Sequence, residues 1–315
     1  MDNNEPIMVS IKCLVYNHAP YLRQCLDGFV MQKTNFRFEA IVHDDCSTDG
    51  SQEIIKEYAA KYPNIIKPIY ETENQYSKHD GSLRRAIDPH LTGKYIAFCE
   101  GDDYWIDPNK LQKQITFLEQ NPDFSMCHTG FINVDENGNT IQRIKYESLM
   151  KQSCSGDILL NLLTGNFILT CTTCMRKDVS ASEIYQNAPF HYDYSMFLSA
   201  SILGKIKYFP EKTAAYRKTP TGAMATQGDL IGTMFLKSQI YFFNGIISGR
   251  FIKDKHRNTR KIKTTIIKAC LYNDSEFKQE FRDILWKNKN IWPYLPWFCF
   301  KRAIVQIARK TKVLK

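Results

Sequence analysis

Over the first 125 residues, short apolar runs alternate with segments whose apolar residues recur at helical spacing. The runs have the length of buried strands and cover the ranges 8–15, 38–44, 65–70 and 95–100. The segments that follow the first, second and fourth runs place apolar side chains on one helical face. Strands that alternate with helices form a parallel sheet that is covered on both faces. The pattern therefore predicts an α/β domain with a Rossmann-like, mostly parallel sheet flanked by helices.

Polar residues mark where two of these helices begin and end. Asp49, with Gln52 three residues later, has the spacing of a capping box, so we expect Asp49 to be an N-cap. A later helix is expected to start at Asp107 with Pro108 at its first helical position, and to end at Asn121 before a second proline. Both helices would follow strands that end in acidic residues.

The second part of the chain has a less regular pattern. It predicts strands over 126–134, 167–175 and 206–209, helices over 157–164 and 193–203, and a helical, aromatic and basic region from about residue 230. Cys171 and Cys174 lie three positions apart in one predicted strand, so their side chains should point to opposite faces. We therefore expect buried thiols rather than a shared metal site.

Three of the predicted strands end in polar clusters. These are Tyr16-Asn17, Asp44-Asp45 and the run 100–103, with the sequence EGDD. The carboxyl ends of parallel strands share one edge, where α/β sheets bind ligands, so the clusters are expected to converge. Close carboxylates repel one another unless a cation or solvent relieves them, and oxygen ligands suit Mg²⁺ or Mn²⁺. The plainer interpretation of the acidic run is a solvated turn followed by a helix cap.

The positive charge is concentrated at one end of the chain. The net charge is +9, yet residues 1–249 carry 24 Lys and Arg against 28 Asp and Glu, and residues 250–315 carry 18 against 5. Aromatic residues in the range 291–300 precede Lys301 and Arg302, as in segments that bind anionic lipid surfaces. The alternative is a helical cap that packs on the domain. We expect no nucleic-acid partner, because no recognised binding motif is present.

The sequence predicts neither export nor membrane insertion. The first residues lack the basic and apolar regions of a signal peptide, and no apolar window reaches the roughly 18 residues of a spanning helix. The ten cysteines are scattered and are expected to stay reduced. We expect a cytoplasmic protein that is peripheral on the inner face of the cell membrane if the basic region binds lipid.

The ordered motifs resemble those of glycosyltransferase family 2. The matching blocks are VSIKCLVYNHAPYLRQCLDGFVMQ, FEAIVHDDCSTDGS and GKYIAFCEGDDYWIDPNKLQKQITFLEQNPD, in the family's order and spacing. The CEGDDYW form is similar to a subgroup of bacterial surface-polysaccharide transferases. The match is strong over about 8–125 and looser over 190–218, where an acid opens a helix and a YR pair follows.

The resemblance implies a GT-A fold. Residues 1–125 would form the nucleotide-sugar-binding half, residues 126–229 the acceptor half, and residues 230–315 a helical basic extension. Asp44 would contact the nucleobase, and Asp102 would bind a divalent metal, Mn²⁺ or Mg²⁺. The residues implied to bind the nucleotide sugar are Tyr16, Asn17, Asp44, Asp45, Arg84, Glu100 and Gly101.

Asp193 matches the family's catalytic acid, which would accept the proton of the acceptor hydroxyl as a general base. Its plainer role is a helix N-cap. The chain departs from the family twice, because Glu100 replaces the usual Asp and no His follows shortly after Arg217. His191 is a further candidate near the base, and Arg85, like Arg84, suits either phosphate or solvent.

The resemblance predicts an inverting glycosyltransferase. It would move a sugar from a nucleotide donor, expected to be a UDP-sugar, to a glycan or lipid-linked acceptor in surface polysaccharide synthesis. The alternative is a non-catalytic relative of the same fold that binds sugar nucleotides or glycans. A nicotinamide-dependent oxidoreductase is excluded, because no G-x-G-x-x-G follows the first strand.

Overall fold

The computed structural model describes residues 5–142, 144–190, 192–219 and 228–251. By its internal packing the chain forms two compact units, one of residues 1–158 and 167–228, and one of residues 159–166 and 229–315. The boundaries expected between the functional halves, after residues 125 and 229, stay predictions. The first unit contains the sheet and the residues of the predicted site.

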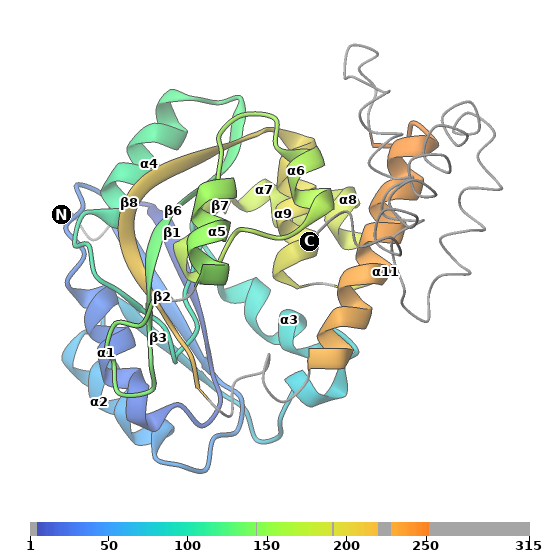
Figure 1. Ribbon diagram of the computed structural model, residues 1–315. Coiled ribbons are helices and arrows are strands. Elements are labelled where there is room, and N and C mark those ends of the chain that lie inside the picture. Colours follow the sequence, from blue (N-terminus) through green and yellow to red (C-terminus); the bar gives the residue numbers. More distant parts are fainter. Residues whose placement is uncertain (1–4, 143, 191, 220–227, 252–315) are drawn as a thin grey trace, which may run out of the picture. The chain divides into compact units, whose positions relative to one another are not determined.

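An eight-stranded sheet forms the centre of the first unit (Figure 1). Its strands in spatial order are β3 (Ile66–Tyr70), β2 (Arg37–Asp44), β1 (Ile7–Val15), β4 (Tyr95–Phe98), β7 (Cys174–Arg176), β6 (Phe124–Val134), β8 (Lys205–Arg217) and β5 (Tyr104–Trp105). The first four strands are parallel, and β6 is parallel to β8. Strands β7 and β5 run antiparallel to their neighbours. The predicted α/β class with a mostly parallel sheet is confirmed.

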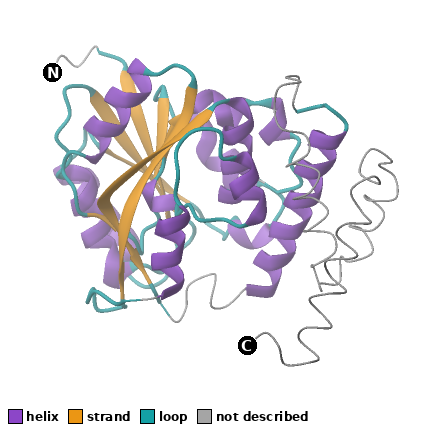
Figure 2. Ribbon diagram, turned by 45° about the horizontal axis from the view of Figure 1, so that its top comes forward, coloured by secondary structure: helices purple, strands orange, loops and turns teal. Residues whose placement is uncertain are grey.

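Helices cover both faces of this sheet (Figure 2). The helices of the first unit are α1 (Ala19–Val30), α2 (Ser51–Lys61), α3 (Ser82–Ile87), α4 (Lys110–Gln120), α5 (Ile144–Gln152), α7 (Lys177–Ala181), α8 (Glu183–Gln186) and α9 (Asp193–Leu203). Three short 3-10 segments join them: η1 (Tyr76–Lys78), η2 (Asp88–His90) and η3 (Thr170–Thr172). Figure 1 shows α1 and α2 on one side of the sheet and α3 and α9 on the other.

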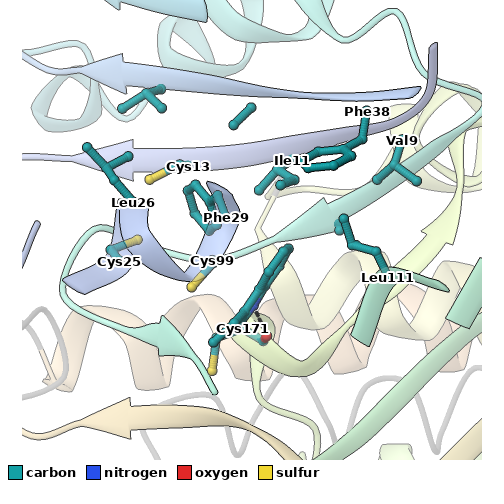
Figure 3. Packing of buried hydrophobic residues seen from close by; sticks show 14 of the residues in the cluster. Val9, Ile11, Cys13, Cys25, Leu26, Phe29, Phe38, Cys99, Leu111 and Cys171 are labelled. Carbon is teal, nitrogen blue, oxygen red and sulfur yellow. Dashed lines mark hydrogen bonds between the residues drawn. The ribbon is translucent and has the colours of Figure 1, made fainter. Parts of the chain in front are cut away.

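One face of the sheet is apolar. Ile11 and Cys13 of β1 are fully buried on this face, in a cluster with side chains of α1, α2 and α4 (Figure 3). The Trp105 ring meets the Phe29 ring edge-on with centroids 5.1 Å apart, and its indole N–H donates to the Cys171 carbonyl at 2.9 Å. Full burial of a large apolar side chain stabilises a fold by about 1.5–3 kcal/mol, so this face holds the sheet to its helices.

The opposite face of the same strands is polar. Ser10 and Glu39 are in-register neighbours on β1 and β2, and their side chains hydrogen-bond at 2.7 Å. Lys12 forms an ion pair with Asp88 of η2 at 2.9 Å. Because successive strand residues alternate between faces, these groups project away from the apolar core. Buried charges are costly unless they are paired, so the pairing of this layer is what permits charged residues beneath the predicted site.

The expected starts of two helices are wrong. Helix α2 has Gly50 as its N-cap, and α4 begins at Lys110 rather than at Asp107. The Asp49 carboxylate instead accepts from the N–H groups of Ala19 and Ser51, at 2.8 and 3.0 Å. These donors from the start of α1 and from α2 hold Asp49 between the two helices. The Asp107 carboxylate accepts from the N–H of Asn109. This local turn precedes the helix, which therefore begins later than expected.

The strand predicted over 167–175 is also corrected. Residues 170–172 form η3, and only Cys174–Arg176 pair as a strand. The Thr172 and Thr173 hydroxyls donate to the carbonyls of Leu169 and Thr170, at 2.6 and 2.8 Å. Such local bonds compete with a strand ladder. Cys171 and Cys174 are both buried free thiols, as expected, although they do not share a strand.

The described part of the second unit consists of two helices. These are α6 (Leu159–Thr164) and α11 (Gly228–Ile247), and the Gln239 amide donates to the Leu163 carbonyl at 3.2 Å. Within the described residues, no helix has the length and apolar character that crossing a membrane requires. Most of the basic region expected at 250–315 lies outside the described residues.

The buried His128 of β6 makes stability depend on pH. Its side chain is 1% exposed, and burial lowers its pKa to about 3. The unfolded chain binds a proton there below about pH 6.5, but the folded chain stays neutral down to about pH 3. The contribution of His128 to the free energy of unfolding should therefore be complete above pH 6.5. Below that pH the free energy of unfolding should fall, by at most about 1.4 kcal/mol per pH unit from this group.

Urea unfolding at pH 7.5, 6.0 and 5.0 tests this. His128→Phe should lose less stability on acidification than the wild type, whereas the exposed His90→Gln should follow the wild type. Equal slopes for His128→Phe and the wild type would contradict the prediction.

Candidate functional site

The carboxyl ends of β1, β2 and β4 lie side by side. Val15 is in register with Asp44. The Gly101 N–H, just beyond β4, donates to the Leu14 carbonyl at 2.9 Å. The three polar clusters that end these strands are thereby brought to one edge of the sheet. The functions assigned to the side chains of these clusters stay predictions.

Asp44 lies at the end of β2 with its side chain fully buried. Its Oδ2 accepts from the Ser47 N–H at 3.1 Å and from the Gln52 amide at 2.7 Å. Within the described residues, its Oδ1 is buried without a hydrogen-bond partner. Burial, followed by the charge of Asp44, raises the pKa of Tyr70, and Tyr16 is 49% exposed at the end of β1. The cluster therefore contains a buried acceptor without a partner, next to the exposed Tyr70 on the neighbouring strand.

Asp45 and Asn17 hold loops in place. The two carboxylate oxygens of Asp45 accept from the N–H groups of Gln75 and Tyr76, at 2.7 and 2.9 Å. The Asn17 amide oxygen accepts from the Thr48 N–H at 2.9 Å, and Asn17 has a positive φ of 56°. Both residues were predicted to bind the nucleotide sugar, but their side chains make these internal contacts.

Glu100 sits in a strongly acidic environment. Burial raises its pKa to about 8, and the charges of Asp102 and Asp193 act in the same direction. Lys12 opposes the shift. The charges of Asp102 and Asp193 therefore both act on the Glu100 carboxyl group, although Asp102 and Asp193 are far apart in the sequence.

The two aspartates of the acidic turn, Asp102 and Asp103, differ in their hydrogen bonds. Asp103 is 3% exposed and accepts from the Arg217 N–H at 2.8 Å, and burial followed by the charges of Asp102 and Glu100 raises its pKa. The Asp102 carboxylate is half-buried and accepts no hydrogen bond from any described residue. The described residues contain no ready-made group of three metal-ligating side chains. The open carboxylate and the surrounding negative charge nevertheless fit a hard divalent cation with water or substrate oxygens as its other ligands.

Arg217, at the end of β8, clamps this turn. Its Nε donates to the Asp102 carbonyl at 2.8 Å, and its Nη2 donates to Gln24 Oε1 at 2.6 Å. Its Nη1 donates to the carbonyls of Asp135 and Glu136, at 3.2 and 3.1 Å. The residue is 4% exposed, so its charge is buried with every nitrogen of the guanidinium bonded. Such full pairing is what a buried cation requires.

The two candidate diphosphate-binding arginines differ. Arg84 of α3 lies 3.5 Å from Asp88, whose other carboxylate oxygen binds Lys12, and its Nε is buried without a partner among the described residues. The Arg85 side chain is 60% exposed and donates to the Asp80 carbonyl at 2.9 Å. Arg84 therefore joins the charged layer of the sheet, and Arg85 lies at the surface.

Asp193 is the first residue of α9 rather than its N-cap, which is Tyr192. Its carboxylate accepts from the Thr170 hydroxyl at 3.0 Å and from the Tyr194 N–H at 2.7 Å. Burial raises its pKa, and the hydrogen bonds oppose that shift. Asp193 is half-buried, and a carboxylate with a raised pKa binds a proton more readily than an ordinary exposed one.

Three residues of this region were not predicted as site residues. Lys12 interrupts an apolar strand, which is a signal that could have been noticed. The sequence pattern marks Arg217 only as part of the YR pair, and its hydrogen-bond partners lie far away in the sequence. His18 follows Asn17 and lies against Gly101, a contact with no trace in the sequence pattern. His191 lies outside the described residues.

Solved structures identify the fold class. S. aureus TarS 1–349, in complex with UDP, has a TM-score of 0.58 at 17% identity, over 86% of this chain and 74% of that one. The mannosyltransferase PcManGT from Pyrobaculum calidifontis, in complex with GDP-Man and Mn²⁺, has a TM-score of 0.52 at 15% identity, over 98% of this chain and 87% of that one. The chain has the GT-A fold of such glycosyltransferases.

The sequence identifies the family. Residues 10–181, more than half of the chain, match glycosyl transferase family 2, and the chain belongs to this family. An uncharacterised protein of Mycobacterium tuberculosis is 35% identical over 217 residues, which are 68% of this chain and 60% of that relative. The chain thus matches about three fifths of that relative's length.

Replacing Arg217 by Lys should loosen the acidic turn. Lysine keeps the charge but cannot bond all four acceptors at once, so we expect a loss of about 1–3 kcal/mol of stability. Hydrogen exchange of the peptide spanning 99–106 should rise roughly tenfold or more through local opening.

Arg176→Lys is the matched control. Arg176 also bonds several groups, among them the Phe124 and Leu118 carbonyls, but at the other end of the sheet. This variant should raise exchange around residues 117–125 and leave 99–106 protected. Unchanged exchange of 99–106 in Arg217→Lys would show that the clamp does not hold the turn.

Proposed function

We propose that the chain is an inverting, metal-assisted glycosyltransferase that takes its sugar from a nucleotide donor, with UDP as the expected nucleotide. The observation that carries the proposal is that Asp44 and Asp102 lie at the carboxyl edge of the sheet, and that the half-buried Asp193 lies near enough for its charge to raise the pKa of Glu100. Each has a different environment, which suits a different task. The bound UDP of TarS supports the choice of nucleotide.

The nucleotide would lie along the edge between the first two acids. The free Oδ1 of Asp44 would accept from the imide N–H of the base, with Tyr16 beside it. Asp102 would hold Mn²⁺ or Mg²⁺, with Glu100 next to it, and the cation found in PcManGT supports this assignment. When bound, the cation would offset the negative charge of the departing nucleoside diphosphate. Arg84 is proposed to contact the diphosphate.

Asp193 is proposed as the general base. Its carboxylate would take the proton of the acceptor hydroxyl as that oxygen forms its bond to the anomeric carbon. The bond from that carbon to the diphosphate oxygen breaks in the same displacement. Attack opposite the leaving group inverts the anomeric carbon. The raised pKa of Asp193 favours this proton transfer, and the bond from Thr170 orients the carboxylate.

The acceptor and the location of the protein rest on the motif resemblance. The CEGDDYW form supports a glycan or lipid-linked acceptor in surface polysaccharide synthesis. Residues 250–315 are proposed to bind the anionic inner face of the cell membrane, through their basic and aromatic composition. The protein would then be cytoplasmic and peripheral.

The mechanism is tested by a screen of UDP- and GDP-sugars with Mn²⁺, in which the release of nucleoside diphosphate is measured. Asp193→Asn should lower kcat roughly 10²–10⁴-fold with little change in the donor KM, because it removes a general base. Asp102→Asn should raise the Mn²⁺ concentration needed for half-maximal activity. Asp123→Asn removes an exposed acid paired with Lys205 and should leave activity unchanged.

Two outcomes would contradict the proposal. One is that no donor is transferred or hydrolysed by the wild type. The other is full activity in Asp193→Asn. A uniform loss in all three variants, Asp123→Asn included, would point to a general effect of removing charge.

A further inference from the structure

His18 lies between the loop after β2 and the acidic turn. Its N–H donates to Ser51 Oγ at 3.0 Å. The N–H groups of the residues before and after it donate to Ser47 Oγ at 2.9 Å and to Asp49 Oδ2 at 2.8 Å. Three consecutive backbone donors therefore dock this segment onto residues 47–51. The position of His18 is set by these bonds and does not depend on its own side chain.

The imidazole packs directly against Gly101. A Cβ atom at residue 101 would lie 2.8 Å from His18 Nδ1 and 3.0 Å from Val15 Cγ2, which is too close for a side chain. The glycine between Glu100 and Asp102 therefore gives the ring its place. Because Gly101 directly precedes Asp102, the imidazole lies beside the proposed cation-binding residue.

The surroundings of the ring leave one nitrogen for a ligand. Nδ1 is buried without a hydrogen-bond partner among the described residues, so Nε2 is the nitrogen that can reach outward. Burial lowers the pKa of His18, although the charges of Asp102, Asp49 and Asp44 oppose this shift, with Asp102 the strongest of the three. The ring is thus a hydrogen-bonding group near both the proposed base-binding and the proposed cation-binding acids.

We propose that the His18 imidazole binds the diphosphate of the nucleotide sugar, donating a hydrogen bond from Nε2 to a phosphate oxygen. The inference rests on the proposed function, in which the nucleobase lies at Asp44 and the cation at Asp102. The diphosphate must connect these two points and lie at the cation end. His18 touches the residue next to Asp102, which favours the diphosphate over the ribose as its partner. Gly101 then has a defined task, to admit this ring.

Calorimetric titration of the full chain, with Mn²⁺ present, can separate the phosphate contact from the rest of the nucleotide. His18→Ala should weaken UDP binding roughly tenfold or more, the effect of losing a hydrogen bond to a charged group. Binding of uridine should stay within about twofold, because it lacks the phosphates. His18→Gln, which carries its amide N–H about as far out as Nε2, should retain more UDP affinity than His18→Asn.

Two further variants complete the design. Gly101→Ala should displace the ring and weaken UDP binding without removing His18. His90→Ala changes an exposed histidine and should bind UDP as the wild type does. If His18→Ala does not fold, judged by its circular dichroism melting curve, the comparison of His18→Gln with His18→Asn decides the question.

The outcomes separate this inference from the proposed function. Unchanged UDP affinity in His18→Ala, or equal losses for UDP and uridine, would overturn the diphosphate contact alone. Equal UDP affinity in His18→Gln and His18→Asn would also overturn it. A wild type that binds neither UDP nor GDP in the presence of Mn²⁺ would overturn the proposed function, and the inference with it.

Discussion

The buried guanidinium of Arg217 joins parts of the chain that no local interaction would bring together. It bonds the Asp102 carbonyl, the turn at 135–136 and Gln24, and it stacks 4.7 Å from the centre of the Tyr21 ring. A turn with three acids in four residues repels itself, and a buried cation is unstable without acceptors. The turn supplies acceptors to the buried guanidinium, and the positive charge of the guanidinium reduces the repulsion among the acids of the turn. The acidic turn can therefore lie at the edge of the sheet before any metal or nucleotide arrives.

The sheet supports this site by having two unlike faces. The apolar face binds α1, α2 and α4 through ordinary burial, whereas the other face carries paired charges such as Lys12 and Asp88. A layer of charged residues under a ligand site keeps polar groups available where few water molecules can enter. Because these groups pair with one another, the free-energy cost of burying them is limited. The same burial raises the pKa of Glu100 and of Asp193. The environment that suits the proposed proton transfer is thus a consequence of how α9 and η3 pack on the sheet.

Local patterns in the sequence were sufficient for the parallel half of the sheet, because alternating apolar runs and strand ends are encoded over fewer than ten residues. The same patterns failed at Asp49, whose carboxylate bonds the start of another helix, and at 170–172, where threonine hydroxyls bond nearby carbonyls. Contacts across long sequence separations were out of reach. Gln24 and Arg217 are 193 positions apart, and no periodicity records such a pair. His18 became visible only through the space that Gly101 leaves.

The two Asp-Asp pairs at the edge show how one residue type takes two tasks. In each pair the second aspartate is committed to the backbone: Asp45 accepts from two N–H groups of one loop, and Asp103 accepts from the N–H of Arg217. The first aspartate keeps acceptor capacity, at the buried Oδ1 of Asp44 and at the open carboxylate of Asp102. A carboxylate bonded to backbone N–H groups fixes the loop from which its neighbour projects. An isolated acid in either place would have to be ligand and anchor at once, so the doubling leaves at least one carboxylate oxygen of the neighbouring acid without a partner at a defined position.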